Sequence, residues 1–415
     1  MAPPSARATA LHALAEWRRR DRFADLILQQ TLSRTALAGP DRGFVNELFY
    51  GVLRNLTLLD FWIGLLRSGK VDDATRDLLR LGLYQIALLN TPAHAAVFET
   101  VQLAPKRTRG VVNAVLRSAD RRLAELHELA ASQPLHVRFS HPEFLVAKWL
   151  QQFGDANTLE LCRWNNQAAP VYLRINELKN TREEFLRTNE GAVVLPNDSR
   201  FVSLPDSRPP LEAGTAYAQD PSTTVACDLL APRPNETVLD ACAAPGGKTS
   251  YLAQIMENRG TIIACDRTPA RLERLRENLG RLGVTNARVV EHDWHHGPLV
   301  ANLVGNGFDR ILVDAPCSNT GVMRRRIDVR WRVRPADFAH MPNEQFEIVR
   351  QILPALRPGG VIVYSTCSIE PEENEQVVER ITAAFPFLKL TDTRSVLPFR
   401  DGLDGAFAAH LTRSG

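Results

Sequence analysis

Residues 239–249 read Leu239-Asp240-Ala241-Cys242-Ala243-Ala244-Pro245-Gly246-Gly247-Lys248-Thr249. The stretch starts in an apolar, strand-like run, passes through small residues and enters a helix-like segment at Gly247. Small residues let the backbone approach a ligand closely, and strand, glycine loop and helix in this order form the first crossover of a nucleotide-type sheet. The stretch therefore predicts a parallel α/β sheet with a ligand at its carboxyl edge.

The chain beyond Pro232 continues in the same way, because strand patterns alternate regularly with helix patterns. Such alternation indicates a mainly parallel sheet with helices on both faces. We predict strands over 237–241, 261–265, 287–290, 311–314 and 361–364, and helices over 247–256, 269–282 and 344–356. These elements define a predicted Rossmann-like α/β domain over residues 229–415.

The glycine loop is compatible with three kinds of cofactor. A Walker loop needs a glycine five positions before Gly-Lys-Thr, but Cys242 stands there, and the dinucleotide pattern Gly-x-Gly-x-x-Gly is absent. S-adenosylmethionine (SAM), which needs no phosphate site, remains. Lys248 opposes the helix dipole, so it indicates either a ligand carboxylate or a nearby acid such as Asp240, and we weigh these equally.

Acidic residues follow the successive predicted strands. Asp266 lies some twenty residues beyond the loop, where an acid is expected to accept hydrogen bonds from ribose hydroxyls. Asp293 follows the third strand and is expected to accept from an adenine amino group, and Asp314 closes the fourth. His292, His295 and His296 lie nearby, but without paired spacing they indicate a polar loop and no metal site.

Two cysteines follow strand-like runs that end in small-residue turns. They are Cys317, after Ile311-Leu312-Val313-Asp314, and Cys367, after Val361-Ile362-Val363-Tyr364. In a parallel sheet both thiols would lie at the carboxyl edge, where ligands bind. Either cysteine alone is best interpreted as a buried core thiol. The matching contexts favour chemistry that makes and breaks a covalent bond to a planar ring.

The first 132 residues differ from the rest in pattern and charge. Apolar residues recur at three- and four-residue spacing, which predicts an all-helical domain. Residues 1–140 hold 19 Lys and Arg against 13 Asp and Glu, a net charge of +6, whereas the remainder carries −3. This suggests an anionic partner for the helical domain, and an ordinary solvated surface stays open as the alternative.

A small α/β segment is predicted over residues 140–228. It starts with a helix over 143–153 and has strands over 171–176 and 214–219 around a helix over 182–188. The six cysteines of the chain form no Cys-x-x-Cys pair, and we see no secretory signal or membrane span. We therefore expect a cytoplasmic protein in a reducing compartment.

Several residue strings resemble the Sun-family RNA cytosine-5 methyltransferases. The similarity covers residues 140–415 and is carried by Asp240–Thr249, Asp314-Ala315-Pro316-Cys317-Ser318, Ser365-Thr366-Cys367-Ser368 and the upstream strings Leu173-Arg174-Ile175-Asn176 and Gln219-Asp220-Pro221-Ser222. The helical front resembles a NusB-like RNA-binding domain through Tyr50-Gly51-Val52-Leu53-Arg54 and Val112-Asn113-Ala114-Val115-Leu116-Arg117. This combination is typical of the bacterial small-subunit (16S) rRNA methyltransferase B type.

The resemblance implies methyl transfer from SAM to C5 of a cytosine in small-subunit ribosomal RNA. C5 is a poor nucleophile until a thiolate adds at C6 and makes the ring an enamine. Cys367 is then the attacking thiolate, Cys317 assists product release, and Asp314 hydrogen-bonds the base. DNA cytosine-5 methyltransferases attack from a Pro-Cys at the position of Cys317, and the Thr366-Cys367 context decides for the RNA type. The implied cofactor residues are Cys242, Ala243, Ala244, Pro245, Gly246, Gly247, Lys248, Asp266, Asp293 and Asp314.

An arginine-rich run follows the first cysteine turn directly. Residues 324–334 contain six Arg, one Asp and one Trp, which suits phosphates and a stacked base better than a solvated helix face. The predicted RNA contacts are Arg174, Arg324, Arg325, Arg330 and Trp331.

The chain departs from the family pattern at three places. Asn319 replaces a glycine, but Asn tolerates the left-handed conformation, so the turn is expected to form. Arg326-Ile327 stands where His-Pro is common, and Ala406 stands where a second aromatic residue is common. We expect the change at Arg326-Ile327 to leave the chemistry intact and to affect local RNA contacts.

Two hypotheses of other classes remain open. One is a P-loop ATPase that uses Gly247-Lys248-Thr249 with the strand over 309–314, and the other is a non-catalytic RNA-binding factor with a degenerate fold. The intact cysteine pair argues against the second. We expect a monomer that needs neither metal nor membrane.

Overall fold

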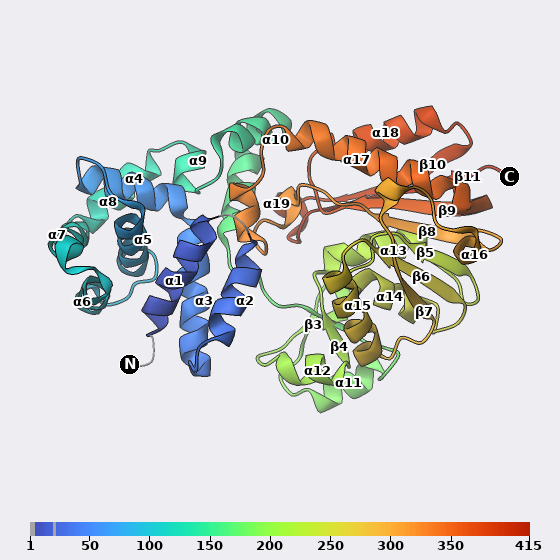
Figure 1. Ribbon diagram of the computed structural model, residues 1–415, viewed down its shortest axis with the longest axis horizontal. Coiled ribbons are helices and arrows are strands. Elements are labelled where there is room, and N and C mark those ends of the chain that lie inside the picture. Colours follow the sequence, from blue (N-terminus) through green and yellow to red (C-terminus); the bar gives the residue numbers. More distant parts are fainter. Residues whose placement is uncertain (1–4, 20–21) are drawn as a thin grey trace. The chain divides into compact units, whose positions relative to one another are not determined.

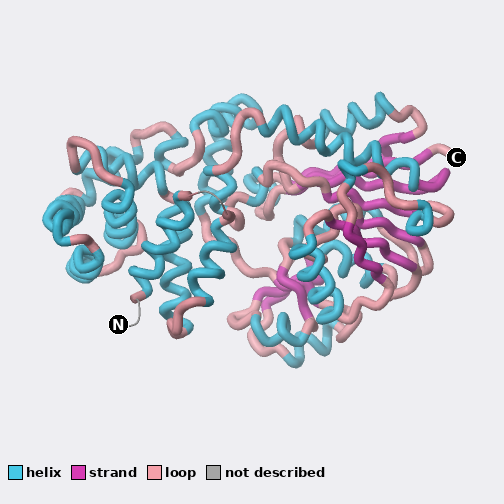
Figure 2. Tube along the Cα trace, viewed as in Figure 1, coloured by secondary structure: helices cyan, strands magenta, loops and turns pink. Residues whose placement is uncertain are grey.

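The computed structural model describes residues 5–19 and 22–415, and its contacts divide the chain into two units. The first unit comprises the residues up to Gln167 together with Met323–Arg332, and the second comprises Ala168–Val322 and Val333–Gly415. The chain therefore leaves the second unit after Val322 and returns to it at Val333. Figure 2 shows the first unit as helices and loops, with all strands in the second.

The first unit is helical, as its periodicity predicts. Amphipathic helices bury their apolar stripes in one core, in which Trp62 is fully buried and its Nε1 donates to Leu126 O at 3.0 Å. The predicted helix over 143–153 forms the first half of the last helix, which breaks at Gly154 with φ +75°. The helices are α1 (Ala6–Arg18), α2 (Ala24–Ser33), α3 (Gly39–Arg54), α4 (Leu56–Leu66), α5 (Asp73–Ala87), α6 (Ala93–Leu103), α7 (Lys106–Arg121), α8 (Leu123–Ala131), α9 (Leu135–Arg138) and α10 (Glu143–Asn166), with the 3₁₀ turn η4 (Ile327–Trp331).

The second unit starts with a small antiparallel sheet of order β2-β3-β1-β4. Two of its strands and one helix match the predicted small α/β segment, whereas β2 and β3 were not predicted because they are short and largely unburied. The elements are β1 (Leu173–Ile175), α11 (Arg182–Thr188), β2 (Val193–Leu195), β3 (Asp198–Ser203), α12 (Arg208–Ala213) and β4 (Ala216–Ala218).

A seven-stranded sheet of order β10-β11-β9-β8-β5-β6-β7 forms the body of the second unit. The five predicted strands are β5–β9 and pair in parallel, which confirms the mainly parallel α/β fold. The hairpin of β10 and β11 was not predicted, and β11 pairs antiparallel with β9. The strands are β5 (Thr237–Asp240), β6 (Thr261–Asp266), β7 (Ala287–Glu291), β8 (Phe308–Asp314), β9 (Leu356–Thr366), β10 (Leu388–Val396) and β11 (Ala406–Arg413).

Helices cover both faces of this sheet (Figure 1). Along β8, Ile311 and Val313 pack into the core on one face, while Leu312 packs into the core on the other. Burial on both faces explains why the central strands read as continuous apolar runs. One face carries α17 (Asp337–Ile352) and α18 (Glu375–Ala384), and the other carries α13 (Val225–Leu230), α14 (Gly247–Ile255) and α15 (Pro269–Leu282).

The helices of the described part of the chain differ from membrane spans in length or composition when each is taken singly. No single helix there is long and apolar enough to cross a bilayer, and α3 with α4, bent by 76°, passes by length and composition only as a pair.

The predicted domain limits at 132, 140 and 229 stay a prediction. The structure places α10 with the first unit by its contacts.

Candidate active site

The glycine loop lies between β5 and α14 and is held by backbone hydrogen bonds. Ala241 N donates to Leu312 O at 2.9 Å and Ala243 N donates to Cys265 O at 2.7 Å, so the loop is fastened to both neighbouring strands. Gly246 has φ +107°, and a Cβ on Gly247 would lie 2.8 Å from Tyr217 Cε1. Only glycine satisfies this turn and this close approach.

Asp240 ends β5 beneath the loop and is fully buried. Its Oδ2 accepts from Thr249 Oγ1 at 2.7 Å, while Oδ1 is buried and has no hydrogen-bond partner among the described residues. Burial raises the pKa of Asp240 to about 7, which the Thr249 hydrogen bond partly opposes. The sequence suggested Asp240 only as a partner for Lys248. Asp240 Oδ1 is therefore an open hydrogen-bond acceptor beneath the loop.

Lys248 pairs with a local acid, as one of the two interpretations of this lysine expects. Its Nζ lies 2.7 Å from Asp314 Oδ2, and Ser365 Oγ donates to Asp314 Oδ1 at 3.0 Å. Burial by itself lowers the pKa of Lys248, but the Asp314 carboxylate more than offsets this and the net shift is upward. The acid is Asp314 and not Asp240. The pair connects α14 to the ends of β8 and β9.

The two cysteine turns meet at the carboxyl edge of the sheet, as predicted. Strands β8 and β9 are parallel neighbours with Asp314 opposite Ser365, and Cys317 Sγ lies 3.3 Å from Cys367 Sγ. Neither Cys317 nor Cys367 is in a disulfide bond. The hydrogen bond to Cys367, followed by burial, raises the pKa of Cys317. A protonated Cys317 next to a second thiol is an arrangement suited to proton exchange between them.

Asn319 forms the turn after Cys317 in the left-handed conformation, with φ +60°, which confirms the expected tolerance of this substitution. Its Nδ2 donates to Cys317 O at 2.6 Å, and its Oδ1 accepts from Cys367 Sγ at 3.3 Å. A glycine would lack both interactions. The side chain of Asn319 therefore links the two turns.

The remaining predicted cofactor acids also lie at strand ends. Asp266, at the end of β6, is 4% exposed, accepts from Ala244 N at 3.3 Å and lies 3.3 Å from Arg271 Nη1. Asp293 follows β7, and the hydrogen bond from His295 N, at 3.0 Å, lowers the pKa of Asp293. The structure thus brings acids to the carboxyl ends of β5, β6 and β8 and just beyond β7. In the described residues no group of three or more His, Cys, Asp or Glu could hold a metal ion.

Burial contradicts two of the predicted RNA contacts. Arg174, on β1, is 1% exposed, donates to Gln219, Ser250 and Gln254 at 2.7–2.9 Å and lies over the Tyr251 ring. Arg330 is 0% exposed and donates to Asn165 O at 2.8 Å and Asn166 Oδ1 at 2.7 Å. Each guanidinium donates its hydrogen bonds to oxygens inside the protein. The prediction that Arg174 and Arg330 contact RNA is therefore wrong.

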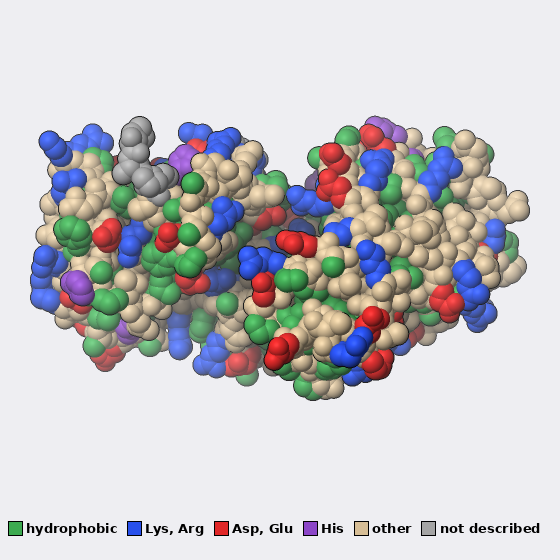
Figure 3. Space-filling view, turned by 90° about the horizontal axis from the view of Figure 1, so that it is seen from below, with side chains coloured by type: hydrophobic (Ala, Val, Ile, Leu, Met, Phe, Trp, Pro, Cys, Tyr) green, Lys and Arg blue, Asp and Glu red, His purple; other side chains and the backbone are tan. Residues whose placement is uncertain are grey.

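The arginine-rich run belongs to the first unit up to Arg332, and its last two residues, Val333 and Arg334, belong to the second. Arg324 is 4% exposed and its guanidinium lies 3.8 Å from the Trp164 ring centroid, while Trp331 Nε1 donates to Leu53 O at 2.8 Å. Arg325 is half-buried, and Arg326 and Arg334 are exposed. Residues 324–332 of the run therefore form η4 and its flanks inside the helical unit. Figure 3 shows Lys and Arg interspersed with Asp and Glu on the face that it presents.

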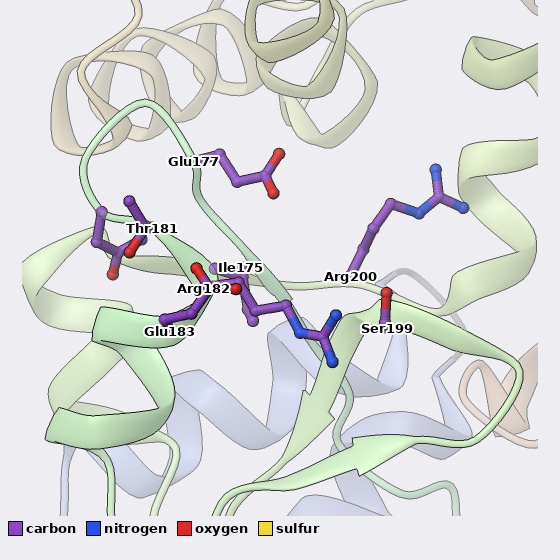
Figure 4. A pocket seen from close by; sticks show the side chains of 8 residues that line it. Ile175, Glu177, Thr181, Arg182, Glu183, Ser199 and Arg200 are labelled. Atoms are coloured by element: carbon purple, nitrogen blue, oxygen red, sulfur yellow. The ribbon is translucent and has the colours of Figure 1, made fainter.

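A cavity of about 400 Å³ lies beside the small sheet (Figure 4). None of the predicted site residues lines it, and Arg200 on its wall is paired with Asp198 and Asp228 at 2.6 and 2.7 Å. The lining residues are Ile175, Glu177, Asn180, Thr181, Arg182, Glu183, Ser199 and Arg200.

Comparison with known families gives matches along the chain. Residues 227–412 match the family described as 16S rRNA methyltransferase RsmB/F, residues 4–121 match the NusB family, and residues 141–192 match the RsmF/B-like ferredoxin-like domain. The predicted helical front and catalytic domain thus each correspond to a family.

Individual relatives are similar over nearly the whole chain. The ribosomal RNA small subunit methyltransferase B of Vibrio cholerae is 36% identical over 402 residues, covering 90% of each chain. The probable ribosomal RNA small subunit methyltransferase B of Bacillus subtilis is 32% identical and covers 100% of both. A solved methyltransferase homolog from Pyrococcus horikoshii is 29% identical with a TM-score of 0.59, covering 67% of this chain and 97% of its own.

Proposed function

Because the chain belongs to the RsmB/F family of 16S rRNA methyltransferases, we propose that it methylates C5 of a cytosine in 16S rRNA through a covalent bond between Cys367 and the base. The observation that carries this proposal is the contact of two thiols, 3.3 Å apart and not in a disulfide bond, at the carboxyl edge of the sheet. A reaction that only forms a covalent bond to the base needs one thiol as the nucleophile. A second thiol in contact with it supports a reaction in which the bond must also be broken.

The proposed reaction has two parts, addition of a thiolate to the base and release of the methylated base. The Cys367 thiolate adds to C6 of the cytosine, which makes C5 nucleophilic, and the Lys248–Asp314 pair beside it binds the polar edge of the ring. After the methyl group is on C5, a base removes the C5 proton and the bond from C6 to Cys367 breaks, with Cys317 assisting this release. The target base must leave its stack to reach these thiols.

SAM fits the residues at the glycine loop. When bound, it supplies an electrophilic methyl group on a sulfonium. The loop from Cys242 to Gly247 would hold it against the sheet edge, with Asp266 on the ribose and Asp293 on the adenine. The unpaired Oδ1 of Asp240 is placed to accept a hydrogen bond from a donor group of the ligand. The pairing of Lys248 with Asp314 supports this proposal over the P-loop interpretation, which needs that lysine for phosphate.

The wider assignments are proposals as well. We propose that residues 1–132 bind ribosomal RNA, that residues 140–228 connect them to a catalytic domain over 229–415, and that the enzyme works as a cytoplasmic monomer. Incubation of 16S rRNA with the protein and methyl-labelled SAM, followed by nucleoside analysis, tests the central proposal. Labelled 5-methylcytidine is expected. Label in another nucleoside would overturn the C5 assignment, and no label would favour a non-catalytic RNA-binding factor.

Replacement of Asp266 by Ala should weaken SAM binding. The carboxylate is buried and its loss leaves ligand hydroxyls and Ala244 N unsatisfied, so we expect a loss of about 1–3 kcal/mol. Calorimetry of the two proteins measures this. Glu291→Ala, which removes an exposed acid opposite Asp266 on β7, is the matched control, and equal affinities of the Asp266 variant and wild type would remove the assignment.

SAM affinity should increase as the pH rises through about 7. Below that pH Asp240 is mostly protonated, and above it the carboxylate is charged and attracts the cationic ligand. Because the ligand favours the ionised form, roughly tenfold weaker binding is expected one pH unit below the pKa of Asp240. Calorimetry at pH 6, 7 and 8 checks this against Asp240→Asn, which should lose this part of the pH dependence. The same dependence in both proteins would assign it to another group.

A further inference from the structure

A buried carboxylate links the two cysteine turns. Glu373, between β9 and α18, is 0% exposed. Its Oε2 accepts from Ser318 N at 2.8 Å and Gln345 Nε2 at 3.0 Å, and its Oε1 accepts from Ser368 Oγ at 2.9 Å and from Ser318 Oγ. Burial raises the pKa of Glu373, and these hydrogen bonds oppose that shift.

The partners of Glu373 are neighbours of the thiols in the sequence. Ser318 follows Cys317, and Ser368 follows Cys367, so one carboxylate holds both turns. Gln345 connects Glu373 to the first turn at a second point, because its Nε2 also donates to Pro316 O at 2.9 Å, just before Cys317. The first turn is therefore fastened on both sides of its cysteine.

The segment that carries Glu373 is itself fixed to β9. Tyr364 Oη donates to Glu373 O at 2.6 Å, and Thr366 Oγ1 donates to Asn374 Oδ1 at 2.5 Å. Asn374 Nδ2 in turn donates to Ser368 O at 3.0 Å. These hydrogen bonds fix the segment that carries Glu373 to strand β9.

We propose that Glu373 is the positioning residue that keeps the Cys317 and Cys367 thiols in contact for the covalent reaction. The inference rests on the proposed function, because only a reaction that uses both thiols needs them held together. The two sulfurs end different strands, and Glu373 adds to the Asn319 contact a buried point to which both turns are hydrogen-bonded. Misplacement of a reacting group by about 1 Å can cost on the order of 100-fold in rate.

The test compares Glu373→Gln with Glu375→Gln. Both changes remove one negative charge from the same segment, but Glu375 is exposed at the start of α18. A glutamine at 373 turns one acceptor oxygen into a donor facing Ser318 or Gln345. We expect Glu373→Gln to lower kcat for methyl transfer roughly 10- to 100-fold with KM for rRNA unchanged, and Glu375→Gln to match wild type.

A second readout reports the thiol contact without catalysis. A diazene oxidant such as diamide takes one electron and one proton from each thiol, and peptide mass mapping follows the Cys317–Cys367 disulfide. Glu373→Gln should form this disulfide more slowly than wild type and Glu375→Gln, with SAM affinity unchanged. Unchanged oxidation or unchanged kcat overturns the proposal. If the wild type makes no 5-methylcytidine, the oxidation result still tests the positioning and separates its failure from that of the proposed function.

Two milder variants keep the test decisive if Glu373→Gln does not fold. Ser318→Ala and Ser368→Ala each remove one side-chain donor to Glu373 and leave the carboxylate in place. If both act through Glu373, each slows disulfide formation and the double variant is slower by less than the product of the single effects. If the two single effects on the rate of disulfide formation multiply in the double variant, or if neither variant has an effect, the two serines do not act through Glu373.

Discussion

Cys317→Ala is expected to accumulate a covalent protein–RNA adduct, whereas Cys367→Ala is expected to form none. Without Cys367 the bond to C6 cannot form, so methyl transfer should fall by at least about 10³-fold, as when a nucleophile is removed from other enzymes that act covalently. Without Cys317 the bond forms but is not resolved. Denaturing gels of both variants with 16S rRNA and SAM display the adduct as a band of reduced mobility.

The outcomes of this experiment separate three mechanisms. Exchanged results would assign the nucleophile to Cys317, as in the DNA cytosine-5 enzymes, and adducts from neither variant would reject covalent catalysis by this pair. Cys162→Ala is a control of the same type, since Cys162 is a buried thiol of α10, outside the glycine loop and the cysteine turns, and burial raises its pKa to about 12. It should change neither the amount nor the lifetime of the adduct.

Arg330→Met is expected to destabilise the helical unit. Arg330 is fully buried, and its donors satisfy Ser140 O, Asn165 O and Asn166 Oδ1 at 2.7–3.3 Å. Methionine fills part of the volume but leaves these oxygens unpaired. Each unpaired buried group costs about 1–3 kcal/mol, so we expect a loss of roughly 2–4 kcal/mol after relaxation.

Hydrogen exchange measured by mass spectrometry localises this loss. Peptides from α3 and α10, which surround Arg330, should exchange faster in Arg330→Met than in wild type. Arg326→Met, an exposed arginine of the same run, should leave exchange unchanged. Unchanged exchange in Arg330→Met together with weaker rRNA binding would reinstate the direct RNA contact that burial contradicts.

Much of the catalytic unit was predictable because its signals are local. The apolar runs of β8 and β9 are buried on both faces, so their composition indicates central strands, and the small-residue turns mark where they end. Parallel strands present their carboxyl ends at one edge, and this geometry places Cys317, Cys367, Asp266 and Asp314 there without further information. The hairpin of β10 and β11 escaped prediction because seven consecutive residues of β10 are exposed and its pattern lacks an apolar face.

The sequence by itself determined the sheet, its functional edge and the residues that arrive there. Only the tertiary structure decided which charged groups are buried and with whom they pair. Glu373 stands among Glu370, Glu372 and Glu375, and nothing in the string distinguishes it until Ser318, Gln345 and Ser368 converge on it. Likewise Arg330 resembles its exposed neighbour Arg326. Strand and turn formation depends on residues adjacent in the chain, whereas burial of a charge depends on partners from distant segments that only packing brings together.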